Sequence, residues 1–466
     1  MKKTKIICSV GPACSSPDVF EQMVNLGADV ARINFSHATL EEKVGVVAMV
    51  KEVRKRTGKN VGILYDTKGP EFRNGLMEDN SELVVGNEIR ILKNEVKGNA
   101  QCFSVNHPQA IDALTIGSTI LLENGLMSIV VKSIEEDGVT CTITSGGVLG
   151  SKKSLSVPGV DLNIPFISEI DEEDIRYACQ HEGDFIACSF VSTADDVLAV
   201  RKILAEENRS DMLIISKIES MTGINNIDEI INVSDGIMVA RGDLGVEVPM
   251  TKLPIMQKMM ARKCRENGKI CVVATEMLES MKTGLRPTRA EVSDVANAVL
   301  DGTDAVMLSG ETTMGKSPIA TVNFMASICR DTEDYYDKKF DYTEKIGVTE
   351  SIADAVCNIE SVMNIKAIIA PTVSGYSAKK ISNLKPKCPI LATCTTAEVA
   401  NKLALNYGVI TKIVPVFNNT DDVLNNATEE AKKAFELQSN DKIIITGSLP
   451  LSSEKRVTNF MKIEEI

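Results

Sequence analysis

Short runs of β-branched and apolar residues alternate with longer stretches of helical periodicity from Lys3 to about Asp334. Apolar runs bounded by polar or glycine-rich turns are typical of buried strands, and their alternation with helices is typical of a parallel sheet. Eight strands are expected, at Thr4–Val10, Val30–Phe35, Val61–Asp66, Phe185–Val191, Met212–Glu219, Gly236–Ala240, Ile270–Thr275 and Ala305–Leu308. Eight strand–helix units predict a (β/α)8 TIM barrel of the α/β class.

One interval between successive strand ends, from Gly69 to Val191, is several times longer than the others. It lacks long helical periodicity and contains short strand-like runs separated by glycines, at Glu88–Leu92, Thr119–Leu122, Ser128–Val131 and Thr140–Ile143. This pattern predicts a small β-barrel or sandwich inserted after the third strand. A module attached by two connections to the active-site end of a barrel is placed to act as a lid.

A third pattern begins after Tyr335, with a helical stretch at Glu350–Met363 followed by alternating strands and helices. The expected strands are Ala367–Ala370, Ile390–Thr393, Val409–Val414 and Ile443–Thr446. This pattern predicts an open three-layer α/β domain. The expected domains are therefore a barrel at 1–70 and 160–338, an inserted β lid at 71–159 and a C-terminal α/β domain at 339–466.

The composition of the chain argues against nucleic-acid binding, a membrane partner and a His-rich metal site. Of the 466 residues, 44% are hydrophobic and 25% are charged, as in ordinary globular proteins. The net charge of -13 has the wrong sign for a protein that binds nucleic acid by neutralising its phosphates. No apolar run approaches the ~20 residues that span a bilayer, so no membrane partner is expected. The 12 cysteines include no Cys-x-x-Cys pair, which favours a cytoplasmic protein, and three histidines exclude a His-rich metal site.

Polar residues occur where the predicted strands end, which is where barrel enzymes carry their chemistry. Lys217 and Glu219 are two residues apart on one strand, so both side chains point to one face, and Asp243 follows the next strand. Two carboxylates with water and substrate oxygens suit Mg²⁺, and a lysine beside the metal would help to stabilise an enolate or a transferring phosphoryl group. A Lys–Glu pair at the strand rim and a helix-capping Asp243 would explain the same residues.

Arg32, Asn34 and Ser36 alternate along the second predicted strand, beside Asp66 and Thr67 at the end of the third. Hard oxygen donors of this kind could hold a monovalent cation or a second metal next to a phosphate that Arg32 binds. Ordinary loop hydrogen bonds would produce the same pattern. Spacing alone leaves both interpretations open.

Other residues could meet phosphates. Arg73 and Lys152-Lys153 lie at the two seams of the insertion, where a closing lid could carry them to a nucleotide, although paired loop lysines are often only solvated. Gly242 allows either close approach of a ligand or a tight turn. In the C-terminal domain, residues 372–377 follow a strand and open a helix, which fits an anion site or a plain helix cap.

Motifs at these positions resemble those of the pyruvate kinase family, in order, over the whole chain. They are Lys5–Pro12, Ala31–His37, Asp66–Arg73, Ile215–Glu219, Met238–Gly245, Ala274–Met281 and Asp294–Glu311. The resemblance implies the barrel, lid and regulatory α/β domain of that family. It also implies transfer of the phosphoryl group of phosphoenolpyruvate to ADP in glycolysis, which yields pyruvate and ATP.

The resemblance implies a role for each matching residue. By similarity, the catalytic residues are Lys217, which stabilises the phosphoryl group in flight, Arg32, which binds the substrate phosphate, and Thr275, near the face where the enolate is protonated. Gly242 and Asp243 complete the substrate contacts. The remaining sets are Glu219 and Asp243 for Mg²⁺ (or Mn²⁺); Asn34, Ser36, Asp66 and Thr67 for K⁺; Asn34, His37, Arg73 and Lys153 for the nucleotide; and Thr372, Ser374, Gly375, Tyr376 and Ser377 for the phosphate of an effector.

Glu71 is the acidic variant of a position where the family can carry lysine, and the resemblance then implies dependence on K⁺. The physical reason is that a bound cation must supply the charge that a built-in ammonium would give. A homotetramer and a phosphorylated small-molecule effector are also implied. The chain departs from the family pattern at four places, which leave the nucleotide preference open: Ser154–Gly159, where Gly-Val-Asn-Leu usually follows the lysines; Ser220–Thr222; Glu276 in place of Gln; and Met314 in place of a nucleotide-contacting lysine.

Two other functions fit parts of the pattern. A barrel lyase or mutase acting on phosphoenolpyruvate or a 2-oxo acid could use Mg²⁺ on the strand-end carboxylates, but it has no evident need for Arg73, Lys153 and a lid. A sensor that kept the fold and the effector loop but lost catalysis would not need intact Lys217, Glu219, Asp243 and Thr275.

Overall fold

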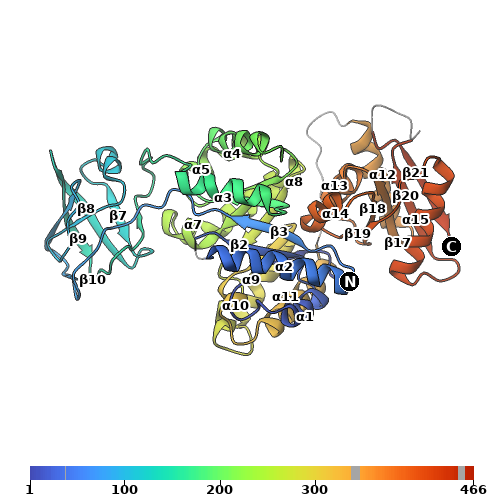
Figure 1. Ribbon diagram of the computed structural model, residues 1–466, viewed down its shortest axis with the longest axis horizontal. Helices are drawn as coiled ribbons and strands as arrows, with labels where there is room; N and C mark the ends of the chain where they lie inside the picture. Colours follow the sequence, from blue (N-terminus) through green and yellow to red (C-terminus); the bar gives the residue numbers. More distant parts are fainter. Residues whose placement is uncertain (37, 337–346, 450–456) are drawn as a thin grey trace.

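The computed structural model describes residues 1–36, 38–336, 347–449 and 457–466, which form three bodies along one long axis (Figure 1). The central body is a closed barrel of eight parallel strands in the order β1-β16-β15-β14-β13-β12-β3-β2. Its strands are β1 (Lys5–Ser9), β2 (Val30–Asn34), β3 (Gly62–Asp66), β12 (Phe185–Cys188), β13 (Leu213–Ile218), β14 (Gly236–Ala240), β15 (Ile270–Ala274) and β16 (Ala305–Leu308). The predicted (β/α)8 barrel is confirmed.

Helices surround the barrel and follow its strands. The longer ones are α1 (Pro17–Leu26), α2 (Leu40–Thr57), α3 (Glu169–Gln180), α4 (Ala194–Glu206), α6 (Ile227–Val233), α8 (Leu253–Glu266), α9 (Arg289–Leu300) and α11 (Pro318–Glu333). Short segments stand at the strand ends: α5 (Met221–Asn225), α7 (Arg241–Glu247), η2 (Glu279–Lys282) and α10 (Gly310–Thr313). Reciprocal capping boxes start four of the longer helices, at Thr39, Ser168, Thr193 and Thr288.

The barrel interior is closed at its amino-terminal end by the C-terminal domain. Inward-facing apolar side chains such as Phe185, Ile215 and Met238 form one buried cluster, and Ala404 and Leu405 of the C-terminal domain belong to it. The opposite end, where the carboxyl ends of the strands open into loops, is therefore the end available for a substrate.

The inserted lid has its own sheets and its own apolar core (Figure 1). A curled six-stranded sheet has the order β11-β7-β8-β9-β5-β6, and a two-stranded sheet pairs β10 with β4. The elements are β4 (Glu82–Leu83), β5 (Glu88–Leu92), β6 (Cys102–Ser104), η1 (Pro108–Ala113), β7 (Thr119–Leu122), β8 (Met127–Glu135), β9 (Gly138–Ser145), β10 (Gly147–Val148) and β11 (Leu155–Ser156). Four strands, β4, β6, β10 and β11, were not predicted, because two or three residues are too few to show a period of two.

The C-terminal domain has three layers, as predicted. Its sheet has the order β19-β18-β17-β20-β21, with β17 (Ile365–Thr372), β18 (Ile390–Cys394), β19 (Val409–Ile413), β20 (Lys442–Gly447) and β21 (Phe460–Glu465). On one face pack α12 (Val348–Val362), α13 (Tyr376–Asn383), α14 (Ala397–Lys402) and η3 (Leu403–Leu405); α15 (Thr420–Phe435) packs on the other. The antiparallel edge strand β21 was not predicted, because its largely exposed side chains show no apolar run.

The described residues contain no helix that could span a bilayer. All twelve cysteines except Cys102 are buried, as expected for cysteines that pack as small apolar side chains.

We expect a buried ion pair between the barrel and the C-terminal domain to be essential for stability. Lys385 follows α13, its side chain is 1% exposed, and its ammonium contacts the carboxylate of Asp304 just before β16. Burial lowers the pKa of Lys385, and the charge of Asp304 opposes that decrease. Because Asp304→Ala leaves a buried ammonium unpaired, we expect about 3–5 kcal/mol of destabilisation, measured as a lower urea midpoint.

The control for this prediction is Lys132→Ala, which breaks an ion pair with Glu88 of the lid, in which both side chains are more than half exposed. Exposed pairs contribute at most about 1 kcal/mol, so its urea midpoint should stay close to that of the unchanged protein. Equal effects of the two substitutions would contradict a stabilising role for the buried pair.

Candidate active site

The ammonium of Lys217 is the centre of the carboxyl end of the barrel. Its Nζ lies 3.1 Å from Asp66 Oδ1 and 3.1 Å from Glu219 Oε1, and it donates a hydrogen bond of 2.6 Å to Ser189 Oγ. Both carboxylate side chains are only 1% exposed. Burial lowers the pKa of Lys217, but Asp66 and Glu219 outweigh this effect and leave the pKa above its ordinary value. The site therefore holds a permanent positive charge.

Asp66 bridges two cations. Its Oδ2 accepts a hydrogen bond of 2.6 Å from Arg32 Nε, while Arg32 also donates to Ser9 Oγ at 2.8 Å. Burial raises the pKa of Asp66, but the charges of Arg32 and Lys217 outweigh burial and hold the pKa below its ordinary value. Two cationic groups are thus fixed on one carboxylate, which is an arrangement suited to a phosphate.

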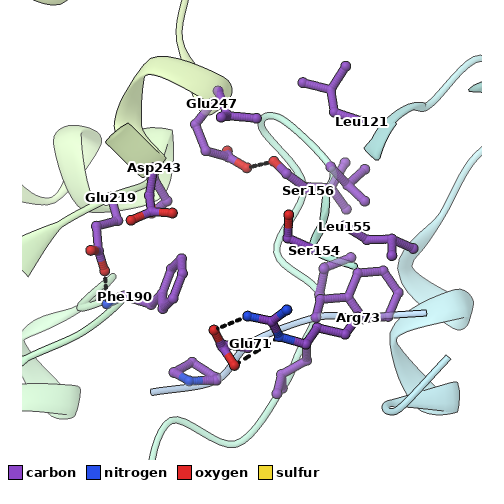
Figure 2. A pocket seen from close by; sticks show the side chains of 18 of the residues that line it. Glu71, Arg73, Leu121, Ser154, Leu155, Ser156, Phe190, Glu219, Asp243 and Glu247 are labelled. Carbon is purple, nitrogen blue, oxygen red and sulfur yellow. Dashed lines mark hydrogen bonds and ion pairs between the residues drawn. The ribbon is translucent and has the colours of Figure 1, made fainter. Parts of the chain in front are cut away.

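Glu219 and Asp243 come from neighbouring strand ends and lie side by side at the cavity (Figure 2). Glu219 Oε2 accepts a hydrogen bond of 2.7 Å from the backbone N–H of Phe190. Burial raises the pKa of Glu219 to about 7; the charge of Lys217 opposes this increase, and that of Asp243 adds to it. A divalent cation would relieve the repulsion between the two carboxylates.

This donor set fits Mg²⁺ or Mn²⁺. Magnesium is commonly bound by one or two carboxylates with water and substrate oxygens, rather than by an all-protein cage. In the part of the chain that the structure describes, no group of three or more His, Cys, Asp and Glu residues could hold a metal by itself. A metal at Glu219 and Asp243 would therefore take its remaining ligands from substrate and water.

The four oxygen donors assigned to a monovalent cation lie on two neighbouring strand ends. The register of β2 with β3 pairs Asn34 with Asp66. The loop hydrogen bonds of the alternative interpretation are also present: Asn34 Oδ1 accepts from the N–H of Ser36 at 3.1 Å, and Thr67 Oγ1 accepts from the N–H of Ser189 at 3.1 Å. His37 lies outside the described residues.

Thr275 has a strained backbone. It is β-branched, yet its φ is +69°, a conformation that costs a non-glycine residue about 1–3 kcal/mol. Its Oγ1 donates to the carbonyl of Ala274 at 2.6 Å and accepts from the N–H of Gly242 at 2.8 Å, and Arg241 donates to its carbonyl at 2.7 Å. The tight-turn interpretation of Gly242 is not supported, because this glycine lies in α7 and its φ is not positive.

The cavity between barrel and lid has a volume of about 520 Å³ and is lined from both sides (Figure 2). Two basic residues predicted to meet a nucleotide line it, and both are paired with acids. Arg73 donates to both oxygens of Glu71, and Lys153 forms an ion pair with Glu123 of the lid. Burial raises the pKa of Glu71, but Arg73 outweighs burial and holds the pKa below its ordinary value.

A second cavity, of about 280 Å³, lies in the C-terminal domain beside the loop of residues 372–377, the predicted anion site. Thr372, Ser374, Tyr376 and Ser377 line it, and the φ of Gly375 is +81° at the start of α13. Thr372 Oγ1 accepts a hydrogen bond of 2.9 Å from the N–H of Gly375, so one hydroxyl already serves the turn.

Sequence reasoning missed three residues of the active-site end. Ser189 hydrogen-bonds Lys217, Phe190 holds Glu219 and has a φ of +58°, and Glu247 lines the cavity. Ser189 stands within the fourth predicted strand end, so the strand-end rule could have found it. Phe190 lies in the same strand end, but it acts through its backbone N–H, which no residue type marks, and no local signal marks Glu247.

Comparisons with known proteins agree with this arrangement. The family model described as pyruvate kinase, barrel domain, matches residues 1–322, and the one described as pyruvate kinase, alpha/beta domain, matches residues 350–464. A pyruvate kinase of Geobacillus stearothermophilus is 42% identical over 473 residues, which cover 100% of this chain and 80% of that protein. One of Staphylococcus aureus is 43% identical over 471 residues, with 99% and 80% covered.

A solved structure is similar over the same length. The crystal structure of a pyruvate kinase from Cryptosporidium parvum superposes with a TM-score of 0.93 at 37% identity, covering 100% of this chain and 96% of that one. Both parts of the chain, the barrel with its lid and the α/β domain, are therefore accounted for by one family. The chain belongs to the pyruvate kinase family and is a phosphotransferase.

Proposed function

We propose that the protein transfers the phosphoryl group of phosphoenolpyruvate to ADP. The bond between phosphorus and the enol oxygen breaks, a bond to a terminal oxygen of ADP forms, and the enolate takes a proton to become pyruvate. One observation carries the proposal: the buried ammonium of Lys217 is held between Asp66 and Glu219 at the barrel end that faces the lid. Such a fixed charge stabilises the negative charge of a phosphoryl group in transit.

The other residues have supporting roles in this proposal. Arg32 binds the substrate phosphate, the backbone at Gly242 and Asp243 contacts substrate, and Thr275 lies near the enolate. Arg73 and Lys153 of the lid, with Asn34 and His37 of the barrel, bind the nucleotide. To bind the nucleotide, Arg73 must leave Glu71 and Lys153 must leave Glu123, and both must contact phosphate oxygens instead. Such a change of partners is consistent with a lid that closes on its substrate.

Two cations complete the proposed site. Glu219 and Asp243 hold Mg²⁺ or Mn²⁺, which neutralises charge on the phosphates, while Asn34, Ser36, Asp66 and Thr67 hold K⁺. The paired state of Glu71 supports the need for K⁺, since this position brings a carboxylate rather than an ammonium to the site. The bound K⁺ would then supply the positive charge that an ammonium at this position would otherwise provide.

The rest of the assignment follows the family. We propose a barrel at 1–70 and 160–338, a lid at 71–159 and an effector and assembly domain at 339–466, in a cytoplasmic homotetramer. A phosphorylated small molecule binds at Thr372, Ser374, Gly375, Tyr376 and Ser377, supported by the cavity beside that loop. The proposed boundary at 338/339 lies outside the described residues.

Potassium should be required for turnover. Pyruvate formation from phosphoenolpyruvate and ADP would be measured on metal-stripped protein with Mg²⁺, with and without K⁺. We expect K⁺ to raise the rate by about tenfold or more, equivalent to ~1.4 kcal/mol of activation free energy. The variant Glu71→Lys should lose most of this response, because its ammonium replaces the cation.

The other possible results of this turnover experiment distinguish the alternative functions. Turnover indifferent to K⁺ would retain the kinase and contradict the cation site. No turnover in either condition, with folded protein and candidate effectors supplied, would favour a lyase. Binding of a sugar phosphate without nucleotide turnover would favour a sensor.

A further inference from the structure

Glu247, the last residue of α7, lies where the lid meets the barrel (Figure 2). The helix α7 also contains Asp243, four residues earlier, and residues four apart lie on the same side of a helix. Both side chains line the cavity. One short helix therefore carries a proposed metal ligand near its start and a carboxylate without an assigned role at its end.

Three segments meet at the Glu247 carboxylate. Ser156 Oγ in β11 of the lid donates a hydrogen bond to its Oε1. Burial raises the pKa of Glu247, and the hydroxyl of Ser156 and the backbone N–H groups of Gly159 and Met221 oppose that increase by stabilising the charged form. Met221 begins α5, two residues after Glu219. The hydrogen bond from Ser156 thus joins the returning segment of the lid to the helix that carries Asp243.

A second part of the lid, the turn between β7 and β8, lies near the end of α7. A Cβ placed on Gly125 in that turn would lie 3.8 Å from a methyl carbon of Val246. Within the described residues, the bond from Ser156 to Glu247 is the only side-chain hydrogen bond that joins residues 72–157 to the barrel. On the outgoing side of the lid, Lys68 of the barrel forms an ion pair of 3.5 Å with Glu71, so the bond from Ser156 is the specific contact of the returning side.

The segment that contains Ser156 is hydrogen-bonded to the segment at Phe72 and Arg73, where the chain enters the lid. The N–H of Leu155 donates to the carbonyl of Phe72 at 2.8 Å, and Arg73 pairs with Ser154 across an antiparallel bridge. Both proposed nucleotide contacts, Arg73 and Lys153, are therefore within a few residues of the segment that Glu247 holds.

We propose that Glu247 is a positioning residue, which fixes the pivot of the lid on the helix that carries Asp243. The proposal rests on the function proposed above. With the pivot held, each closure brings Arg73 and Lys153 to the same place relative to the metal-binding carboxylates. Without it, the lid adopts a wider range of orientations, and the nucleotide loses affinity. Phosphoenolpyruvate is bound by barrel residues and keeps its affinity.

The test uses Ser156→Ala, which removes the lid side of the contact and leaves Glu247 in place. We expect the KM for ADP to rise about fivefold, as for loss of one hydrogen bond, and the KM for phosphoenolpyruvate to change less than about twofold. Hydrogen exchange of the backbone at 153–160 should become faster without substrates. In Ser156→Asn, where the longer amide can also donate to Glu247, both values should return toward those of the unchanged protein.

The matched control is Ser154→Ala, since this hydroxyl bonds only within the lid, to Asn124. It should leave exchange at 156–160 and the KM for ADP unchanged. Equal increases in both KM values, or no change in either KM or exchange for Ser156→Ala, would overturn the proposal. Hydrogen exchange can be measured without turnover, so the two proposals fail separately. If the protein without substitutions does not form pyruvate, the proposed function is contradicted. If that protein is active and Ser156→Ala behaves in the same way, only the role of Glu247 is contradicted.

Discussion

Replacing Lys217 with methionine should lower kcat for pyruvate formation by about 10²–10³-fold, which is typical for loss of one fixed charge at a transition state. Methionine retains most of the apolar stem and removes the ammonium that lies 3.1 Å from both Asp66 and Glu219. The charge is needed most while the phosphoryl group is between its two oxygens, so kcat falls more than the affinity for phosphoenolpyruvate does. In the variant Arg32 still neutralises Asp66, and Glu219 keeps the hydrogen bond from the N–H of Phe190, so the barrel should stay folded.

The measurements are steady-state kcat, calorimetric binding of phosphoenolpyruvate and circular dichroism. Lys202→Met is a matched control, because Lys202 is an exposed lysine on α4 of the same barrel. It should leave all three quantities unchanged. Near-normal turnover of the Lys217 variant would remove this residue from the catalytic role.

Replacing Glu219 with glutamine should weaken Mn²⁺ binding by at least about 100-fold, since even loss of an outer-sphere partner costs a metal site 10–100-fold. Glutamine has nearly the same shape and can still accept the hydrogen bond from the N–H of Phe190. It lacks the negative charge, however, and Lys217 remains 3.1 Å away to repel a divalent cation. The loss is therefore electrostatic rather than steric.

Titration of free Mn²⁺ by electron paramagnetic resonance, with phosphoenolpyruvate present, measures this affinity without turnover. Glu229→Gln is the control, because Glu229 is an exposed carboxylate on α6. Unchanged Mn²⁺ affinity in the Glu219 variant would place the metal elsewhere. A loss of affinity in both variants would indicate general electrostatics rather than a ligand.

Much of the fold could be predicted because buried parallel strands have a strong local signal. The eight barrel strands are found within three residues of the predicted ends, since each is a short apolar run bounded by turns. The lid strands of four residues or more were predicted for the same reason. Strands such as β10 and β21 were not, because two residues have no period and a largely exposed edge strand has no apolar run.

The candidate site was predictable as far as residue order determines position. Because all strands of a parallel barrel end on the same side, Lys217, Glu219 and Asp243 had to face a common end, and alternation put the first two on one face. Which partner each side chain finds was not predictable. The contact of Lys217 with Asp66 joins residues 151 positions apart, and it depends on barrel closure and strand register.

The amino-acid sequence by itself determined the order of the strands, the inserted lid, the α/β domain and the end of the barrel at which the proposed site lies, because these follow from local periodicity and chain direction. Only the tertiary structure decided how the charges are balanced there. The pairs Arg73–Glu71 and Lys153–Glu123, the strained Thr275 and the contact of Ser156 with Glu247 depend on packing between distant segments. Their energies are set by burial and by distances of a few ångströms, which a linear pattern does not contain.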